Sequence, residues 1–186
     1  MSKRIVVLFS GEGTNLQKLM ETLPSRGIEI ACAITNRPAA RGIEKARRFG
    51  VPVEVIDHTK FATREAFDAA LVEMIEKYHP DLTVTAGFMR ILTPVFTEHV
   101  KAINIHPSLL PKYKGANAIA QSYASGDKVC GVTVHWVSGE LDGGEVIAQA
   151  SFECNENMDA EAFEAAVHAL EYELLPDTVC ALLAQE

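Results

Sequence analysis

Two polar side chains alternate at the end of an apolar run in the middle of the chain. Asn104 and His106 lie in the segment Asn-Ile-His-Pro-Ser-Leu. Alternate residues of an extended strand point to the same face, and a proline favours extended backbone in the residue before it. The segment therefore predicts an amide, which donates hydrogen bonds, beside an imidazole, which exchanges protons near neutral pH.

A carboxylate that could serve this pair comes later, at Asp142, within the sequence Leu-Asp-Gly-Gly. A catalytic histidine needs a partner that orients it, and a carboxylate does this well. The three groups together suggest acyl or formyl transfer with no covalent nucleophile required. Each group also has a plainer interpretation. Asn104 could cap a turn with His106 half-exposed beside it, and Asp142 could be a turn residue of Asp-Gly-Gly.

A second segment suited to binding, residues 10–15, reads Ser-Gly-Glu-Gly-Thr-Asn and separates an apolar run from a helical pattern. Its glycines let backbone N–H groups approach an anion, and the helix N-terminus adds positive potential. It lacks the third glycine of a dinucleotide motif and the lysine of a P-loop. The segment favours a single phosphate, with Thr14 and Asn15 as side-chain donors. The alternative is a tight turn in which Thr14 or Asn15 caps the helix.

Residues 87–92 read Gly-Phe-Met-Arg-Ile-Leu and follow another apolar run. Such an apolar lip at a strand end could line a pocket for a flat ring, although it could equally pack a strand against a helix and leave Arg90 as a surface charge. Two further signals are weaker. Residues 112–114 are interpreted as a solvated loop, and His135 as a strand residue that faces a helix.

Apolar runs alternate with helical patterns over the first part of the chain. This alternation predicts a parallel α/β sheet with right-handed crossovers. Strands are expected at 4–9, 29–35, 51–56, 81–87 and 101–105, and helices at 16–23, 40–49 and 63–79. In the clearest helix, 63–79, the expected N-cap is Thr63.

The pattern changes after residue 126. Residues 131–137 and 146–150 predict two antiparallel strands with Asp142 between them, and a long helix is expected at 159–183. The predicted fold class is a Rossmann-like α/β domain, with a mostly parallel sheet flanked by helices and an antiparallel addition in the C-terminal half. Since no linker or repeat interrupts the chain, residues 1–186 are expected to form one domain.

Composition narrows the function classes. The net charge of -8 disfavours a nucleic-acid binder, which needs a basic surface to neutralise phosphates. No apolar stretch is long enough for a membrane span, and the cysteines form no C-x-x-C pair, so a cytoplasmic, reduced protein is expected. The histidines show no metal-binding spacing, so no metal is expected. The predicted partners are small-molecule substrates, with a monomeric or weakly dimeric protein.

These motifs occur together, and in this order, in the phosphoribosylglycinamide formyltransferases that use 10-formyltetrahydrofolate. The chain resembles that family over nearly its whole length, and the matching segments are residues 10–16, 63–68, 86–92, 104–111 and 141–144. The Asn-x-His-Pro-Ser motif with a later Asp is shared by folate-dependent formyltransferases and indicates the chemistry. The loop at 10–15 resembles the family's site for the phosphate of glycinamide ribonucleotide.

The resemblance implies a role for each matching residue. It implies that Asn104, His106 and Asp142 are catalytic and that 10-formyltetrahydrofolate is the co-substrate, with no metal. Substrate-binding residues would be Gly13, Thr14, Asn15 and Glu171 for the ribonucleotide, and Arg64, Met89, Arg90, Ile91 and Leu92 for the folate. The sequence departs from the family at Lys114, where proline is common, and at Asn117 and Tyr172, where histidine is common.

Three alternatives remain at this point. A 10-formyltetrahydrofolate hydrolase would use water in place of the amine, but relatives of that kind usually carry an extra N-terminal domain, and this chain begins at its first strand. A methionyl-tRNA formyltransferase would need an RNA-binding domain and a basic face. A non-catalytic folate or nucleotide sensor could keep the fold, although the intact Asn104, His106 and Asp142 speak against it.

Overall fold

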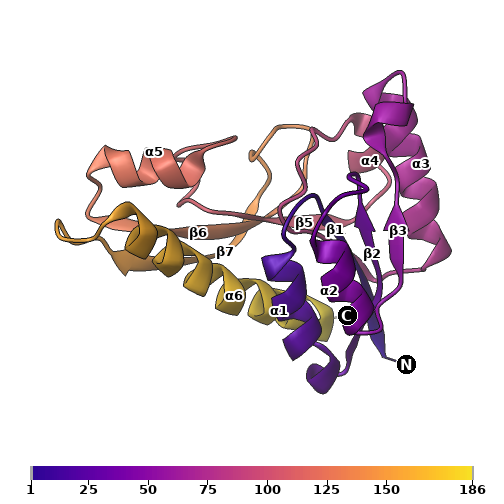
Figure 1. Cartoon of the computed structure of the whole chain (residues 1–186), viewed down its shortest axis with the longest axis horizontal. Helices are drawn as coiled ribbons and strands as arrows, with labels where there is room; N and C mark the ends of the chain where they lie inside the picture. Colours follow the sequence, from indigo (N-terminus) through magenta and orange to yellow (C-terminus); the bar gives the residue numbers. More distant parts are fainter. Residues whose placement is uncertain (1, 186) are drawn as a thin grey trace.

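The computed structural model describes residues 2–185 and shows one twisted sheet with helices on both faces (Figure 1). The seven strands lie in the order β3-β2-β1-β4-β5-β6-β7. Their bounds are β1 Lys3–Phe9, β2 Ile28–Thr35, β3 Val53–Val55, β4 Leu82–Thr85, β5 Ala102–His106, β6 Val129–Trp136 and β7 Val146–Glu153. Strands β1 to β5 pair in parallel, whereas β6 is antiparallel to β5 and β7 is antiparallel to β6. The predicted fold class is confirmed.

The helices cover the two faces unequally. Their bounds are α1 Thr14–Thr22, α2 Gly42–Arg48, α3 Arg64–Lys77, α4 Pro94–Thr97, α5 Ala118–Ser125 and α6 Ala160–Ala184, with 3-10 turns at Pro24–Arg26 and His58–Lys60. In Figure 1, α1, α2 and the long α6 lie on one side of the sheet, and α3 and α4 lie on the other. No helix within residues 2–185 has the length and apolarity that crossing a bilayer requires.

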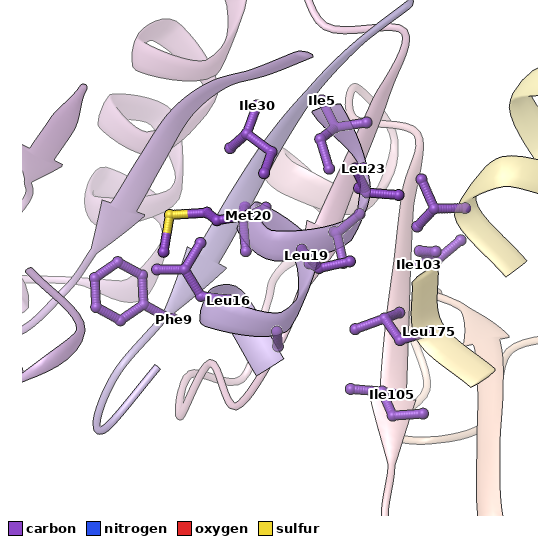
Figure 2. Packing of buried hydrophobic residues seen from close by; sticks show 14 of the residues in the cluster. Ile5, Phe9, Leu16, Leu19, Met20, Leu23, Ile30, Ile103, Ile105 and Leu175 are labelled. Carbon is purple, nitrogen blue, oxygen red and sulfur yellow. The ribbon is translucent and has the colours of Figure 1, made fainter. Parts of the chain in front are cut away.

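The first strand is buried on both faces, as a continuous apolar run predicts. Ile5, Val7 and Phe9 belong to the core under α1, α2 and α6, whereas Val6 and Leu8 belong to the core under α3 and α4. Figure 2 shows the first of these cores, where side chains of α1 and of the residue that follows it lie among residues of the strands and of α6. They are Leu16, Leu19 and Met20 of α1 and Leu23 directly after it.

Most predicted elements are found close to their expected bounds. Thr63 caps α3 as expected, since its side chain accepts a hydrogen bond from the backbone N–H of Ala66 at 3.1 Å. The strand expected at 81–87 stops at Thr85, and Gly87 adopts a φ of 70° that ends the extended backbone. The short helices α4 and α5 were not predicted, because neither carries a clear apolar stripe over several turns.

The strand order places the binding segments together. Strands β1, β4 and β5 are parallel neighbours, so their carboxyl ends meet at one edge of the sheet. In open α/β sheets this edge is where ligands bind. The loops that begin after Phe9, Thr85 and His106 therefore gather there, and they contain most of the residues that the sequence singled out.

Candidate active site

The side chain of Asn104 is held from two sides at the end of β5. The neighbouring Ile103 and Ile105 are buried in the core beneath α6, so Asn104 faces the opposite side of the sheet. There Thr85 Oγ1 lies 2.7 Å from Asn104 Oδ1, and His135 Nε2 lies 3.1 Å from Asn104 Nδ2. The hydroxyl donates to the amide oxygen, and the amide N–H donates to the imidazole.

His135 explains why the amide has a single orientation. It is the direct cross-strand partner of Asn104 in the antiparallel pairing of β5 and β6, and it is 3% exposed. Its Nδ1 lies 2.9 Å from the carbonyl oxygen of Trp136 and must donate there, so Nε2 is left as an acceptor. The pairing uses one N–H of the Asn104 amide and leaves the second for a ligand.

The prediction that His135 faces a helix is wrong, because β6 inserts beside β5 and turns this side chain toward Asn104. A signal was present in the sequence. Thr133 and His135 alternate with Val132 and Val134, which marks a strand with one polar face. This alternation alone does not show which neighbouring strand carries the residues that the polar face contacts.

Asp142 lies between the two histidines. Its Oδ2 is 3.5 Å from His106 Nδ1, and its Oδ1 is 3.6 Å from His135 Nε2. The backbone N–H of Gly115 donates to Oδ2 at 2.7 Å. Burial opposes ionisation of Asp142, but the hydrogen bond from the Gly115 backbone N–H and the charge of the nearby His106 hold its pKa below the ordinary value. The carboxylate is therefore ionised at neutral pH.

His106 is held by acceptors at both of its nitrogens. Nε2 lies 2.8 Å from the carbonyl oxygen of Tyr113, and Nδ1 faces Asp142. Only the imidazolium form has an N–H for each contact. Residues 112–114 are therefore more than a solvated loop, although Lys112 and Lys114 are exposed. The Tyr113 hydroxyl and the Lys112 ammonium group both contact Asp127, at 2.8 and 3.0 Å, and fix this loop over His106.

A cavity of about 110 Å³ opens in front of this cluster. Asn104, His135 and Asp142 line it on one side. The lip of residues 88–92 contributes Phe88, Arg90, Ile91 and Leu92. The structure therefore brings most of the predicted folate residues to Asn104 and Asp142, and His106 contacts Asp142 without lining the cavity itself.

Two predicted folate residues lie outside this wall. Met89 is 65% exposed, and Arg64, at the first turn of α3, is also exposed. Arg90 is not the free surface charge that the plainer interpretation suggested. Its guanidinium carbon lies 4.9 Å from the centre of the Phe67 ring, and its Nε is buried with no partner among residues 2–185.

Ser10 joins the loop after β1 to this lip. Its hydroxyl accepts from the backbone N–H of Met89 at 2.7 Å and donates to Asn36 Oδ1 at 2.6 Å. Ser10 is 1% exposed, so the bonds are shielded from water. The predicted phosphate loop and the predicted folate lip are thus built as one unit.

The loop at residues 10–15 brings Asn15 to Glu171. Asn15 Nδ2 lies 3.3 Å from Glu171 Oε2, although 156 positions separate the two residues. Neither Thr14 nor Asn15 caps α1, because the N-cap is Gly13, with φ 68° and no side-chain bond. The capping alternative is therefore not observed. A Cβ on Gly13 would lie 2.8 Å from Gly42 Cα, so this turn requires glycine.

The structure shows the surroundings of the three residues that depart from the family pattern. Lys114 Nζ lies 2.9 Å from Glu140 Oε1 and links the Tyr113 loop to the loop that carries Asp142. Asn117 adopts a φ of 61° at the start of α5. Tyr172 stacks on His168, with ring centres 6.1 Å apart.

Comparison with known proteins agrees with this geometry. The model of the formyl transferase family matches residues 3–179. The phosphoribosylglycinamide formyltransferase of Escherichia coli K12 is 40% identical over 176 residues, which cover 92% of this chain and 83% of that protein. The crystal structure of phosphoribosylglycinamide formyltransferase from Campylobacter jejuni superposes with a TM-score of 0.95 at 49% identity, covering 98% of each chain.

A much larger protein contains a region that is similar to this chain. The trifunctional purine biosynthetic protein adenosine-3 of Bos taurus is 38% identical over 180 residues, which are 95% of this chain but only 18% of that protein. The chain therefore spans less than a fifth of that trifunctional relative.

Proposed function

The chain belongs to the phosphoribosylglycinamide formyltransferase family, and we propose that it transfers the formyl group of 10-formyltetrahydrofolate to the amine of glycinamide ribonucleotide. The observation that carries this proposal is the cavity whose wall combines the oriented amide of Asn104, the carboxylate of Asp142 and an apolar lip. Residues 1–186 would act as one formyltransferase domain.

The reaction needs no covalent enzyme intermediate. The substrate amine attacks the formyl carbon, a C–N bond forms, and the carbonyl oxygen becomes an oxyanion. The tetrahedral intermediate then collapses, the bond to N10 of the folate breaks, and the proton lost by the amine is delivered to N10. The products are the formylated ribonucleotide and tetrahydrofolate.

Asn104 and His106 would stabilise the oxyanion. The Asn104 amide has one N–H free for this purpose, because His135 accepts the other. A protonated His106 would supply a second donor once its Nε2–H exchanges the Tyr113 carbonyl for the formyl oxygen. Losing one donor of this kind typically costs about 3 kcal/mol of transition-state stabilisation.

Asp142 would keep His106 charged and assist the proton transfer. Its ionised carboxylate lies 3.5 Å from His106 Nδ1, beside the ring that would donate to the oxyanion. It also lines the cavity, where it can accept a proton from the attacking amine, directly or through water, and return it to N10.

The two substrates would approach from different sides of the cluster. Arg90, Ile91 and Leu92 would contact the folate ring, with Met89 and Arg64 farther out on the same side. The ribonucleotide would lie on the loop with Gly13, Thr14 and Asn15 at the N-terminus of α1, close to Glu171. Backbone N–H groups and the helix dipole favour an anion there.

A direct test mixes the purified protein with 10-formyltetrahydrofolate and follows tetrahydrofolate release with and without glycinamide ribonucleotide. The proposal predicts release that requires the ribonucleotide. Release at the same rate in its absence would indicate a hydrolase or another acceptor. Binding of the folate without release under either condition would indicate a non-catalytic sensor.

A further inference from the structure

The carboxylate of Glu171 is buried where α6 packs on α1. Glu171 lies on α6, is 4% exposed, and packs at the contact between α6 and α1 that is visible in Figure 1. A charged carboxylate in such a place is costly unless hydrogen bonds and an opposite charge compensate it. Asn15 supplies one hydrogen bond, at 3.3 Å, but no charge.

His168 supplies Glu171 with a second hydrogen bond and with the opposite charge. It lies one turn earlier on the same helix, and its Nδ1 is 2.8 Å from Glu171 Oε2. Its Nε2 is 3.3 Å from Glu164 Oε1, on the outer side of the helix. Each ring nitrogen therefore faces a carboxylate oxygen, and only the imidazolium form donates to both. The hydrogen bond to Glu171 raises the pKa of His168, against the opposing effect of burial, which agrees with this geometry.

The pair of His168 and Glu171 matters because the proposed ribonucleotide would bind beside it. Glycinamide ribonucleotide carries a phosphate, and the loop proposed to hold it contains Asn15, whose Nδ2 is bonded to Glu171. Asn15 Oδ1 is buried with no partner among residues 2–185, so this side chain is oriented but incompletely satisfied. An uncompensated carboxylate at this position would repel the phosphate.

We propose that His168 is a positioning residue of the ribonucleotide site, which holds the Glu171 carboxylate in place and neutralises its charge beside the substrate phosphate. This inference rests on the proposed function. The groups that pair with or stack on His168 are Glu164, Glu171 and Tyr172 of its own helix, and from α1 the side chain of Asn15 reaches the same Glu171 oxygen.

The test compares His168→Ala, His168→Gln and the matched control Glu164→Gln, which removes only the outer carboxylate. His168→Ala should raise the KM for the ribonucleotide about tenfold, the effect expected of one charge-assisted hydrogen bond, with little change in kcat or in the KM for the folate. His168→Gln, which can donate to Glu171 but carries no charge, should recover part of this loss. Glu164→Gln should change the ribonucleotide KM less than about twofold.

The outcomes separate the two proposals. Ribonucleotide-dependent release with an unchanged ribonucleotide KM in His168→Ala would overturn the role of His168 alone. Equal increases in both KM values, or a fall in kcat alone, would overturn it too, because those are effects of a general structural change or of a catalytic role. Release by the wild-type protein that ignores the ribonucleotide would overturn the proposed function itself.

Discussion

Asn104 and His135 face each other across β5 and β6, and the imidazole accepts one N–H of the amide at 3.1 Å. The carbonyl oxygen of Trp136 fixes the tautomer of the imidazole, and the Thr85 hydroxyl fixes the oxygen of the amide. Residues outside the expected catalytic set therefore decide which way the Asn104 amide points.

Replacing His135 by alanine should lower kcat about 10- to 100-fold with a small effect on both KM values, because the Asn104 amide loses its orientation but stays in place. Steady-state kinetics measures this. A double-mutant cycle provides the control, since His135→Ala should have little further effect when Asn104 is already alanine. Additive losses in the double variant would show that His135 acts independently of Asn104.

Gly13→Ala should destabilise the fold by about 1–3 kcal/mol and raise the KM for the ribonucleotide, since φ is 68° and the new Cβ would press on Gly42 Cα at 2.8 Å. The matched control is Gly126→Ala, at φ 74° with open space around it, which should cost only about 1 kcal/mol. Denaturant unfolding compares the two. Equal losses of unfolding free energy in the two variants would show that the contact with Gly42 does not add to the cost of the Gly13 substitution.

Asp68→Ala should weaken folate binding and stability together. The buried Asp68 carboxylate accepts from the N–H and the hydroxyl of Thr93 at 2.6 and 2.7 Å, directly after the folate lip. Losing both bonds leaves a buried donor unpaired, which costs about 1–3 kcal/mol. Asp68→Asn keeps an acceptor for Thr93 and should cost less. A normal folate KM in Asp68→Ala would show that Asp68 does not position the lip of residues 88–92.

The ion pair between His168 and Glu171 predicts a pH dependence of stability. The hydrogen bond to Glu171 raises the folded-state pKa of His168 above the ordinary 6.5, although burial opposes the shift. The stabilisation is therefore fully present below pH 6.5 and is lost as pH rises through the higher folded-state pKa. Urea unfolding of the wild type and His168→Gln should give free energies whose difference shrinks with rising pH. A constant difference would contradict the ion pair.

Much of this architecture could be predicted from the sequence because the patterns are local. The β-branched run of β1 and the Thr63 cap of α3 depend on neighbours in the chain, and both were predicted. The alternation of Asn104 and His106 with isoleucines likewise gives their common face.

The remaining features depend on contacts between distant segments. The pairing of His135 with Asn104 follows from the register of β6 on β5, and the contact of His106 with Tyr113 follows from the path of the loop after β5. No short pattern encodes either. The burial of Glu171 depends on the packing of α6 against α1. Its pairing with His168 is a local contact three residues apart on one helix, which helical spacing alone could have indicated.

The most direct test of the central claim is the rate of ribonucleotide-dependent tetrahydrofolate release by Asp142→Asn. The control is Asp159→Asn, which alters an exposed carboxylate that caps α6 away from the cluster. We expect the Asp142 variant to stay folded and to lose about a hundredfold or more in turnover, because His106 loses its charged partner and the proton loses its relay. The Asp159 variant should keep nearly normal turnover. Near-normal turnover in Asp142→Asn would contradict formyl transfer at this cluster.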